Sequence, residues 1–216
     1  MNPLASATSQ PRALLVLEDG TTFEGRCCGA SGETFGEIVF NTSMTGYQEI
    51  ISDPSYAGQI VTLTYPQVGN YGIDPAVMQR DVLHLRGFVV HDMCYEPSNW
   101  TSKQSLPEFL QENGVVAIEG IDTRALTMHL RDHGAQKAAI STEDLDPAHL
   151  LARVQASPSI SEHNFVPDVS VDAPHMVTAT SKKRFNVVAY DCGEKNGILQ
   201  GLAANGCEVT VVPWNT

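Results

Sequence analysis

A strand–helix–strand pattern near the end of the chain places the strongest constraint on its fold. An apolar run over 185–190 is followed by a turn over 191–195, a short helix over 196–204 and a second apolar run over 208–212. Short connections of this kind predict two parallel strands joined by a crossover helix. A helix on one side cannot cover both faces of two apolar strands, so we expect residues 184–216 to open a larger α/β domain.

The first half of the chain has a different pattern, rich in short strands. Apolar residues over 13–17 and a partner run over 21–28 flank Asp19-Gly20, a strong hairpin signal. Further strands are expected over 37–41, 59–64 and 86–91, and the glycine-spaced stretch 29–36 is expected to be a loop. Four strands in 64 residues without a long helix predict a mostly antiparallel β region.

Helical signals appear only after residue 100. Ser105 is expected to cap a helix with Pro107 in its first turn and Glu108 at its third position, ending at Gly114. A second helix is expected from an Asp cap at 122 to the glycine at 134, and a third from Asp146-Pro147 to about residue 154.

These patterns together predict an α/β chain in four parts. Residues 1–12 are expected to be a disordered head, and 13–156 a β-rich domain with helices. Residues 157–183 are rich in Ser, Pro, Thr, Asp and His without sustained periodicity, which is typical of a surface linker. The βαβ unit over 184–216 then begins a second domain.

Charge and cysteine content narrow the possible partners. With 13 Lys+Arg against 25 Asp+Glu, the formal net charge is −12, and basic residues cluster only over 182–184, so nucleic acid is not expected as a partner. Five cysteines in irregular positions favour reduced thiols and a cytoplasmic protein. The sequence contains neither a signal-peptide pattern at its start nor a run of about 18 apolar residues, so no membrane association is expected.

Several residues that could carry chemistry have simpler explanations. His129 and His133 have the spacing of a metal pair but lack the neighbouring Glu of a zinc-protease motif, so we interpret them as solvated helix residues and expect no metal site. Gly29, Gly32 and Gly36 lack a following Gly-Lys-Ser/Thr, which favours turns or bulges over a phosphate loop.

The turn over 191–195 invites two functional interpretations. Cys192 lies between a strand and a helix, a position in which a thiol can be activated. The sequence identifies no His or acidic partner for it, so a packing role is favoured. The same turn has one glycine where a dinucleotide fingerprint needs three, so it is a weak nucleotide signal.

The most informative short motif is Asp-Pro-Ser-Tyr at 53–56. Asp followed by Pro predicts a type I turn with Ser55 at its third position, where the hydroxyl can project toward a ligand. A fixed hydroxyl can donate to a carboxylate or accept from an ammonium group. From spacing alone, a solvent-facing turn serine is the favoured interpretation.

Longer segments carry a family resemblance. They are LLVLEDG at 14–20, GEIVFNTSMTGYQEI at 36–50, DPSY at 53–56, QIVTLTYP at 59–66 and IDTR at 121–124. From about residue 13 to the last residue, the sequence resembles the small, glutamine-handling subunits of carbamoyl phosphate synthetase. The resemblance implies a β/α N-terminal domain followed by a class I glutamine amidotransferase domain, of which 184–216 would be the first βαβ unit.

The resemblance also implies an activity and partners. It implies hydrolysis of L-glutamine to glutamate and ammonia, which passes to a large subunit that forms carbamoyl phosphate from bicarbonate, ammonia and ATP, for arginine and pyrimidine synthesis. ATP and Mg²⁺ are expected on the large subunit and no cofactor on this chain. Ser55 matches the family serine that reaches bound glutamine, which reverses the interpretation from spacing. Lys195 resembles a family lysine near the ammonia path, and Cys192 does not match the nucleophile.

Class I amidotransferases use a Cys on a nucleophile elbow with a distant His and Glu, and no such segments occur in these 216 residues. We therefore assign no catalytic residue in this chain, and expect it to be a fragment or shortened form without glutaminase activity of its own. Two other classes remain as alternatives: a non-catalytic module that docks on the large subunit and, least favoured, a nucleotide-binding βαβ protein.

Overall fold

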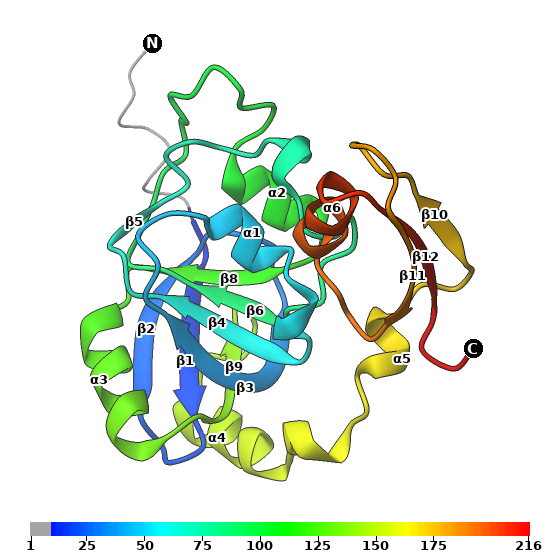
Figure 1. Cartoon of the computed structure of the whole chain (residues 1–216). Coiled ribbons are helices and arrows are strands. Elements are labelled where there is room, and N and C mark those ends of the chain that lie inside the picture. The colour runs from blue at the N-terminus through cyan, green and yellow to red at the C-terminus, as the bar shows by residue number, and fades with distance from the viewer. Residues whose placement is uncertain (1–9) are drawn as a thin grey trace.

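The structure, a computed structural model, describes residues 10–216. Most of the expected disordered head over 1–12 lies outside the described residues, and its last residue, Arg12, begins the first strand. The described part is a mixed α/β structure in which a barrel built from the first two thirds of the chain is joined to a smaller sheet built from the last third (Figure 1).

The barrel contains seven strands within the described residues, in the order β1-β2-β8-β6-β4-β3-β9. Its strands are β1 (Arg12–Leu17), β2 (Thr22–Cys27), β3 (Glu33–Asn41), β4 (Gln59–Leu63), β6 (Gly87–Val89), β8 (Val116–Glu119) and β9 (Gln136–Ser141). The hairpin predicted around Asp19-Gly20 is confirmed, because β1 and β2 pair antiparallel with Ala13 opposite Gly25. A separate pair, β5 (Gln67–Val68) with β7 (Asp92–Met93), lies beside the barrel.

The expectation of a mostly antiparallel region holds only in part, because four of the seven strand pairs of the barrel in residues 10–216 are antiparallel and three are parallel. The pairs β3–β4, β4–β6 and β6–β8 are parallel, whereas β1–β2, β1–β9, β2–β8 and β3–β9 are antiparallel. Parallel neighbours need a connection that returns the chain to the starting edge. Short helices supply it: α1 (Tyr47–Ile51) and η1 (Pro54–Tyr56) before β4, η2 (Pro75–Val77) before β6, and α2 (Leu106–Glu112) before β8.

The glycine-spaced stretch was also predicted incorrectly in part. Strand β3 begins at Glu33, so Gly36 lies inside a strand, opposite Ala138 of β9, instead of in a loop. A Cβ atom on Gly36 would lie 2.6 Å from the carbonyl oxygen of Gly58. The glycine therefore permits a close approach of two backbones in the barrel wall.

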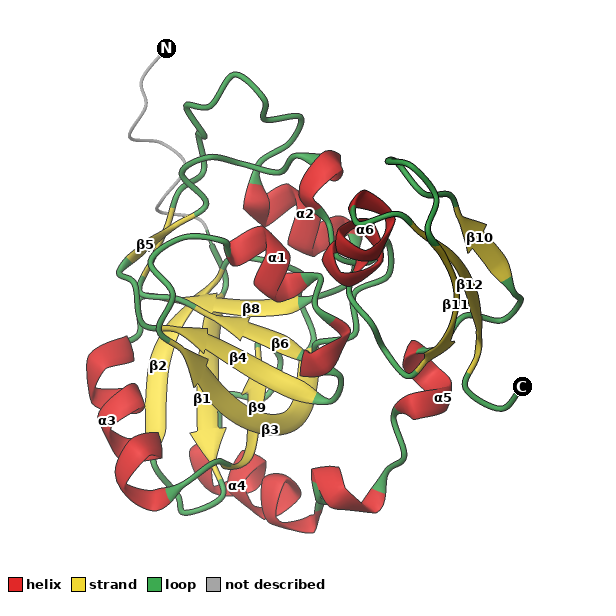
Figure 2. Ribbon diagram, in the orientation of Figure 1, coloured by secondary structure: helices red, strands yellow, loops and turns green. Residues whose placement is uncertain are grey.

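The helices predicted from capping signals are confirmed. Ser105 and Glu108 form the reciprocal capping box of α2. Asp122 caps α3 (Thr123–His133) through the amide of Ala125, and Asp146 caps α4 (Pro147–Ala156). Figure 2 shows α1 and α2 on one side of the barrel and α3 and α4 near its opposite end.

Alternating side chains of the strands build the core. Leu15 and Leu17 of β1 join a cluster to which all seven barrel strands contribute, together with Leu126 and Leu130 of α3. The intervening Leu14 and Val16 pack instead against α4. This alternation is what a strand between two apolar layers requires. A further cluster packs α1 and α2 against the barrel.

The C-terminal unit has the βαβ form that the sequence predicted. Strands β11 (Phe185–Asp191) and β12 (Cys207–Pro213) pair in parallel, and α6 (Asn196–Ala204) connects them. The preceding segment 157–183 contains η3 (Ile160–Glu162), α5 (Val166–Val169) and β10 (His175–Val177), which pairs antiparallel with β12. The sheet order is β10-β12-β11, so β11 is an edge strand.

Candidate functional site

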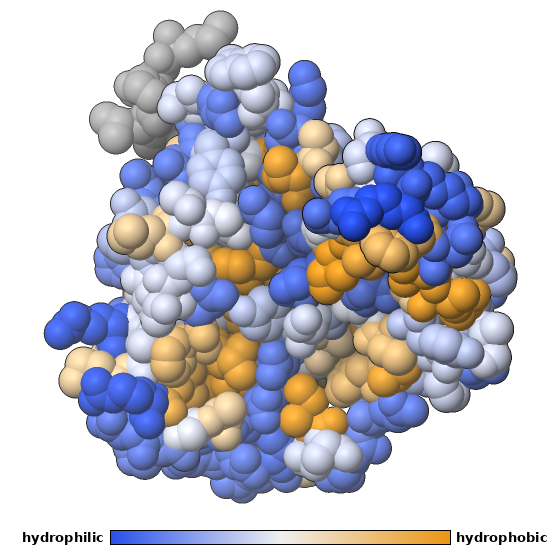
Figure 3. All heavy atoms as spheres, in the orientation of Figure 1, coloured by the Kyte–Doolittle hydropathy of each residue, from blue (hydrophilic) through white to orange (hydrophobic). Residues whose placement is uncertain are grey.

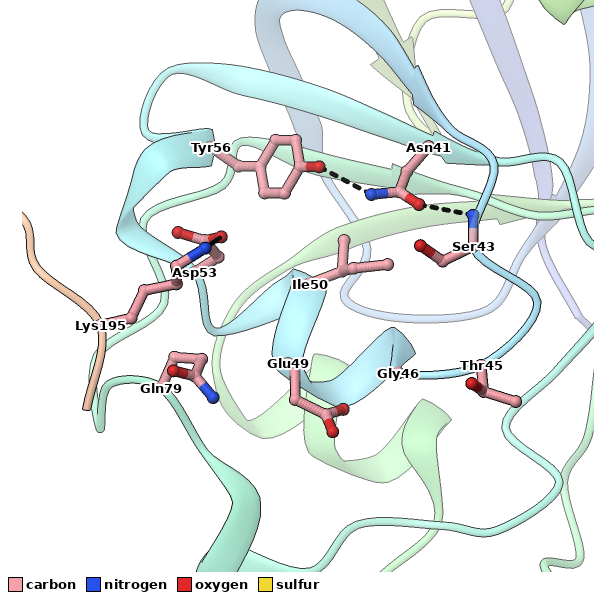
Figure 4. A pocket seen from close by; sticks show the side chains of 10 residues that line it. All are labelled: Asn41, Ser43, Thr45, Gly46, Glu49, Ile50, Asp53, Tyr56, Gln79 and Lys195. Atoms are coloured by element: carbon pink, nitrogen blue, oxygen red, sulfur yellow. Dashed lines mark hydrogen bonds and ion pairs between the residues drawn. The ribbon is translucent and has the colours of Figure 1, made fainter. Parts of the chain in front are cut away.

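A polar cleft of about 510 Å³ lies where the barrel meets the C-terminal unit (Figure 4). Most of its wall comes from the segment between β3 and β4, and Lys195 enters from the turn before α6. The residues that line it are Asn41, Ser43, Thr45, Gly46, Glu49, Ile50, Asp53, Tyr56, Gln79 and Lys195. The cleft therefore joins residues that lie far apart in the sequence.

One wall is held by a short hydrogen-bond chain at the end of β3. The Asn41 side-chain amide donates to the Tyr56 hydroxyl over 2.9 Å, and its carbonyl oxygen accepts from the Ser43 amide over 2.8 Å (Figure 4). Asn41 thus fixes both the start of the 42–46 loop and the end of η1.

Helix α1 forms the floor and begins at a glycine for a backbone reason. Gly46 has φ 83°, a left-handed conformation that side-chain-bearing residues rarely adopt. The hydroxyl of Tyr71 accepts from the amides of Gly46 and Tyr47 over 2.7 and 2.9 Å, which satisfies two free N–H groups at the helix start. Desolvation by burial raises the pKa of Tyr71, so this hydroxyl stays protonated at neutral pH.

Glu49 and Gln79 give the cleft further polar atoms. The Oε2 atom of Glu49 is buried and has no hydrogen-bond partner within residues 10–216. Gln79 accepts through Oε1 from the amide of Gly197, 3.2 Å away, and so ties the cleft rim to α6. Glu49 therefore adds a carboxylate to the cleft lining, with one of its oxygens buried.

Asp53 brings the two residues named from the resemblance together. The turn predicted at 53–56 is present, since the amide of Tyr56 donates to the Asp53 carbonyl oxygen over 3.1 Å. The Asp53 carboxylate accepts from the amide of Ser55 through Oδ1 over 2.9 Å and from the Lys195 ammonium through Oδ2 over 3.1 Å. One carboxylate therefore links the Ser55 turn to the C-terminal unit.

Ser55 and Lys195 differ in their relation to the cleft. Lys195 lines it, whereas Ser55 is exposed on the outer side of η1 and is not among the lining residues. Within the described residues the Ser55 hydroxyl forms no hydrogen bond, so it is free to meet a ligand or another chain. The sequence pattern indicates only a turn at Asp53 and no role for Glu49. The usable signal for Glu49 is an acidic residue in the first turn of a helix that follows Thr45-Gly46.

The turn over 191–195 is organised by its first residue. The fully buried Asp191 accepts through Oδ1 from the amides of Gly193 and Glu194, at 2.9 and 3.2 Å. A phosphate at a helix start needs amides of this kind free to donate. Because they already donate to Asp191, this turn is not arranged as a nucleotide cradle.

Cys192 was expected to pack and does not. It is exposed, next to the buried Asp191, so the packing interpretation was wrong. Alternation along the chain explains the difference, because Asp191 turns inward to organise the loop and its neighbour then points outward.

The two helix histidines make local contacts. The Nε2 atom of His129 lies 2.5 Å from Oδ2 of Asp19 in the hairpin turn. The His133 ring stacks on the His129 ring, with ring centroids 4.3 Å apart. Among residues 10–216, no group of three His, Cys, Asp or Glu side chains is placed to hold a metal ion. No helix in that same range is long and apolar enough to cross a membrane.

The barrel, the βαβ unit and the cleft between them define an α/β protein of two modules with a small polar site at their junction. The chain belongs to the carbamoyl-phosphate synthase small chain family, since the model of that family's CPSase domain matches residues 15–140. This match covers the barrel and most of the cleft wall.

Curated relatives extend the similarity to most of the chain. The carbamoyl phosphate synthase small chain of Syntrophotalea carbinolica is 49% identical over 217 residues, which cover 95% of this chain and 58% of the relative. The small chain of Nitratidesulfovibrio vulgaris is 49% identical, and that of Thermotoga maritima is 48% identical, with 58% and 52% of those relatives covered. The chain thus spans a little over half the length of these relatives.

Proposed function

We propose that this chain is a glutamine-binding part of the small subunit of a glutamine-dependent carbamoyl phosphate synthetase. The whole subunit would hydrolyse L-glutamine to glutamate and ammonia and pass the ammonia to a large subunit. That subunit would use ATP and Mg²⁺ to form carbamoyl phosphate from bicarbonate and ammonia, for arginine and pyrimidine synthesis in the cytoplasm. The observation that carries the proposal is the Asp53 carboxylate, which accepts from the Ser55 amide on the outer side of η1 and from the Lys195 ammonium in the junction cleft, in a chain from this family.

The chemistry of the site suits an amino-acid amide. The Ser55 hydroxyl, which is exposed outside the cleft lining, can bond either the carboxylate or the ammonium group of an amino acid. The Lys195 ammonium lines the cleft and can donate to an oxygen of a ligand there. A volume of about 510 Å³ falls in the range of about 300–1,000 Å³ that is common for small-molecule sites.

The same proposal assigns a role to each part of the chain. Residues 13–156 would bind the large subunit and present Ser55, and 157–183 would be the connecting segment. Residues 184–216 would form the first βαβ unit of a class I amidotransferase domain, with Lys195 near the ammonia path. The nucleophilic Cys, the His and the Glu of that domain have no counterpart in these 216 residues, so we expect no ammonia release from glutamine by this polypeptide alone.

A hybrid subunit tests the proposal. Residues 1–216 are joined to the part of the Syntrophotalea carbinolica small chain that lies beyond the matched region, and ammonia release from glutamine is measured. We expect glutaminase activity to appear. Replacing Ser55 by Ala should raise KM about three- to tenfold with little change in kcat, because it removes one hydrogen bond to the bound substrate.

Ser181→Ala is the matched control, since Ser181 is an exposed serine of the C-terminal segment away from the cleft. An unchanged KM is expected for it. A hybrid that binds a large subunit but releases no ammonia would favour the docking-module alternative. Equal KM values for Ser55→Ala and Ser181→Ala would remove the proposed role of Ser55.

A further inference from the structure

Arg80 lies on the barrel side of the junction and binds two residues of the turn over 191–195, just before Lys195. Its Nη2 lies 2.5 Å from Oδ1 of Asp191, and its Nε donates to the carbonyl oxygen of Glu194 over 2.9 Å. The Asp191 side chain is fully buried and that of Arg80 is 18% exposed, so this ion pair is shielded from solvent. Arg80 therefore holds both the first and the fourth residue of the turn.

The same turn is closed from within by the Asp191 carboxylate. Oδ1 accepts from the Gly193 and Glu194 amides, and Oδ2 accepts from the Val171 amide over 2.9 Å. These bonds close the turn around Asp191, and Arg80 is its ionic attachment to the barrel. Next to it, the amide of Asn196 donates to the Gln79 carbonyl oxygen over 3.2 Å.

Lys195 is the last residue of this turn, and the attachment of its side chain is weaker. A single contact of 3.1 Å joins its ammonium to Asp53, and 43% of its side chain is exposed. An exposed pair of this kind does not by itself hold a long flexible side chain in one place. The place of the Lys195 backbone decides whether the ammonium can reach Asp53. Arg80 holds the residues before Lys195, and Gln79 binds the amides of Asn196 and Gly197 after it.

We propose that Arg80 is a positioning residue for the Lys195–Asp53 pair: by clamping Asp191 and the Glu194 carbonyl, it keeps the Lys195 ammonium on the carboxylate that also holds the Ser55 turn. The role in glutamine handling rests on the proposed function. The positioning itself does not, and it is tested without glutamine.

The test is trace labelling of amines in the 216-residue chain at fixed pH, with the reactivity of Lys195 measured relative to the exposed Lys103 by mass spectrometry of the peptides. Arg80→Met should raise this ratio about two- to fivefold, the effect expected when one exposed ion pair is lost. Asp53→Asn should raise the ratio to a similar extent in the parent chain and add nothing in the Arg80→Met background. Arg80→Lys, which can reach Asp191 but cannot also donate from an Nε, should give an intermediate ratio.

Arg26→Met is the matched control, because Arg26 pairs with another buried carboxylate, that of Glu119, in the barrel. It should leave the Lys195 ratio at the parent value. The proposal is overturned if Arg80→Met leaves the ratio unchanged, if Arg26→Met raises it as much, or if Asp53→Asn has its full effect in both backgrounds. Should Arg80→Met fail to fold, Arg80→Lys decides alone, and a parent-like ratio for it overturns the proposal.

Discussion

At the scale of single residues, the junction contains two neighbouring acids with opposite pKa shifts. Burial works to raise the pKa of Asp191, but the Arg80 guanidinium and the amides of Gly193 and Glu194 outweigh it and lower that pKa. Desolvation and the nearby Asp191 raise the pKa of Glu194, and its Oε1 is buried without a partner among the described residues. Ionising the Glu194 carboxylate is therefore less favourable in the folded chain than in the unfolded chain.

Replacing Glu194 by Gln should stabilise the chain at neutral pH. A raised folded-state pKa means that the native chain binds the proton more tightly than the unfolded chain, in which the pKa is near 4.5. Glu194 thus subtracts stability as pH rises above 4.5, and Glu194→Gln should remove that part of the slope. Urea unfolding from pH 4 to 8 would measure it. The explanation is contradicted if the difference in the free energy of unfolding between Glu194→Gln and the parent chain does not grow with pH, or if it equals the difference for the exposed Glu143→Gln.

Asp53 illustrates what single-residue reasoning could and could not reach. Asp53 followed by Pro54 predicts the turn, and the turn is present. Its second role depends on Lys195, which is 142 positions away in the sequence, and no local pattern reports such a contact. The prediction that Cys192 packs was wrong for the same reason. Its exposure follows from the inward orientation of Asp191, which is bonded to the distant Arg80.

At the scale of elements, those with a local signal were predicted and those decided by distant partners were not. Ser105 and Glu108 predict the start of α2 from a pattern of only four residues, and their capping box is confirmed. By contrast, β3 extends back to Glu33 because β9, about a hundred residues later, pairs with it there. Strand β10 lies in a segment without periodicity and owes its form to pairing with β12.

Gly36→Ala tests the close approach inside β3. Its Cβ atom would lie 2.6 Å from the Gly58 carbonyl oxygen, which is backbone and cannot rotate away. We expect a loss of about 1–3 kcal/mol in the free energy of unfolding, measured by urea denaturation followed by circular dichroism. Gly201→Ala in α6 is the control, since a Cβ atom there meets open space and the change should be neutral or stabilising. A loss for Gly36→Ala no larger than that for Gly201→Ala would show that the wall can relax.

At the scale of the whole molecule, the sequence indicated an α/β chain with a β-rich first part but not a closed barrel. Closure depends on β9, which pairs with both β1 and β3 and joins the two ends of the strand series. The cleft is a further consequence of tertiary structure, because its wall comes from the β3–β4 connection and its cation from the C-terminal unit. Two of the segments that carry the family resemblance, 36–50 and 53–56, contain most of the residues that line the cleft.

The two modules should differ strongly in local stability. Barrel strands have hydrogen-bonded neighbours on both sides, whereas β11 is an open edge. Two of its side chains, Val188 and Tyr190, are 62% and 56% exposed, and Figure 3 shows apolar surface on this part of the molecule. Regions with few buried contacts open locally at a much lower free energy than the core does.

Hydrogen exchange and limited proteolysis should therefore separate residues 184–216 from 13–150. We expect amides of β11 to exchange about a hundredfold faster than those of β1, which corresponds to a difference of about 3 kcal/mol in opening free energy. Trypsin should cut first near Lys182, Lys183 and Arg184, before Arg124 or Arg131 in α3. Arg80→Met should widen the gap, because it frees the end of β11 at Asp191 from the barrel. Uniform protection across both regions would mean that the junction contacts alone make the two modules one cooperative unit.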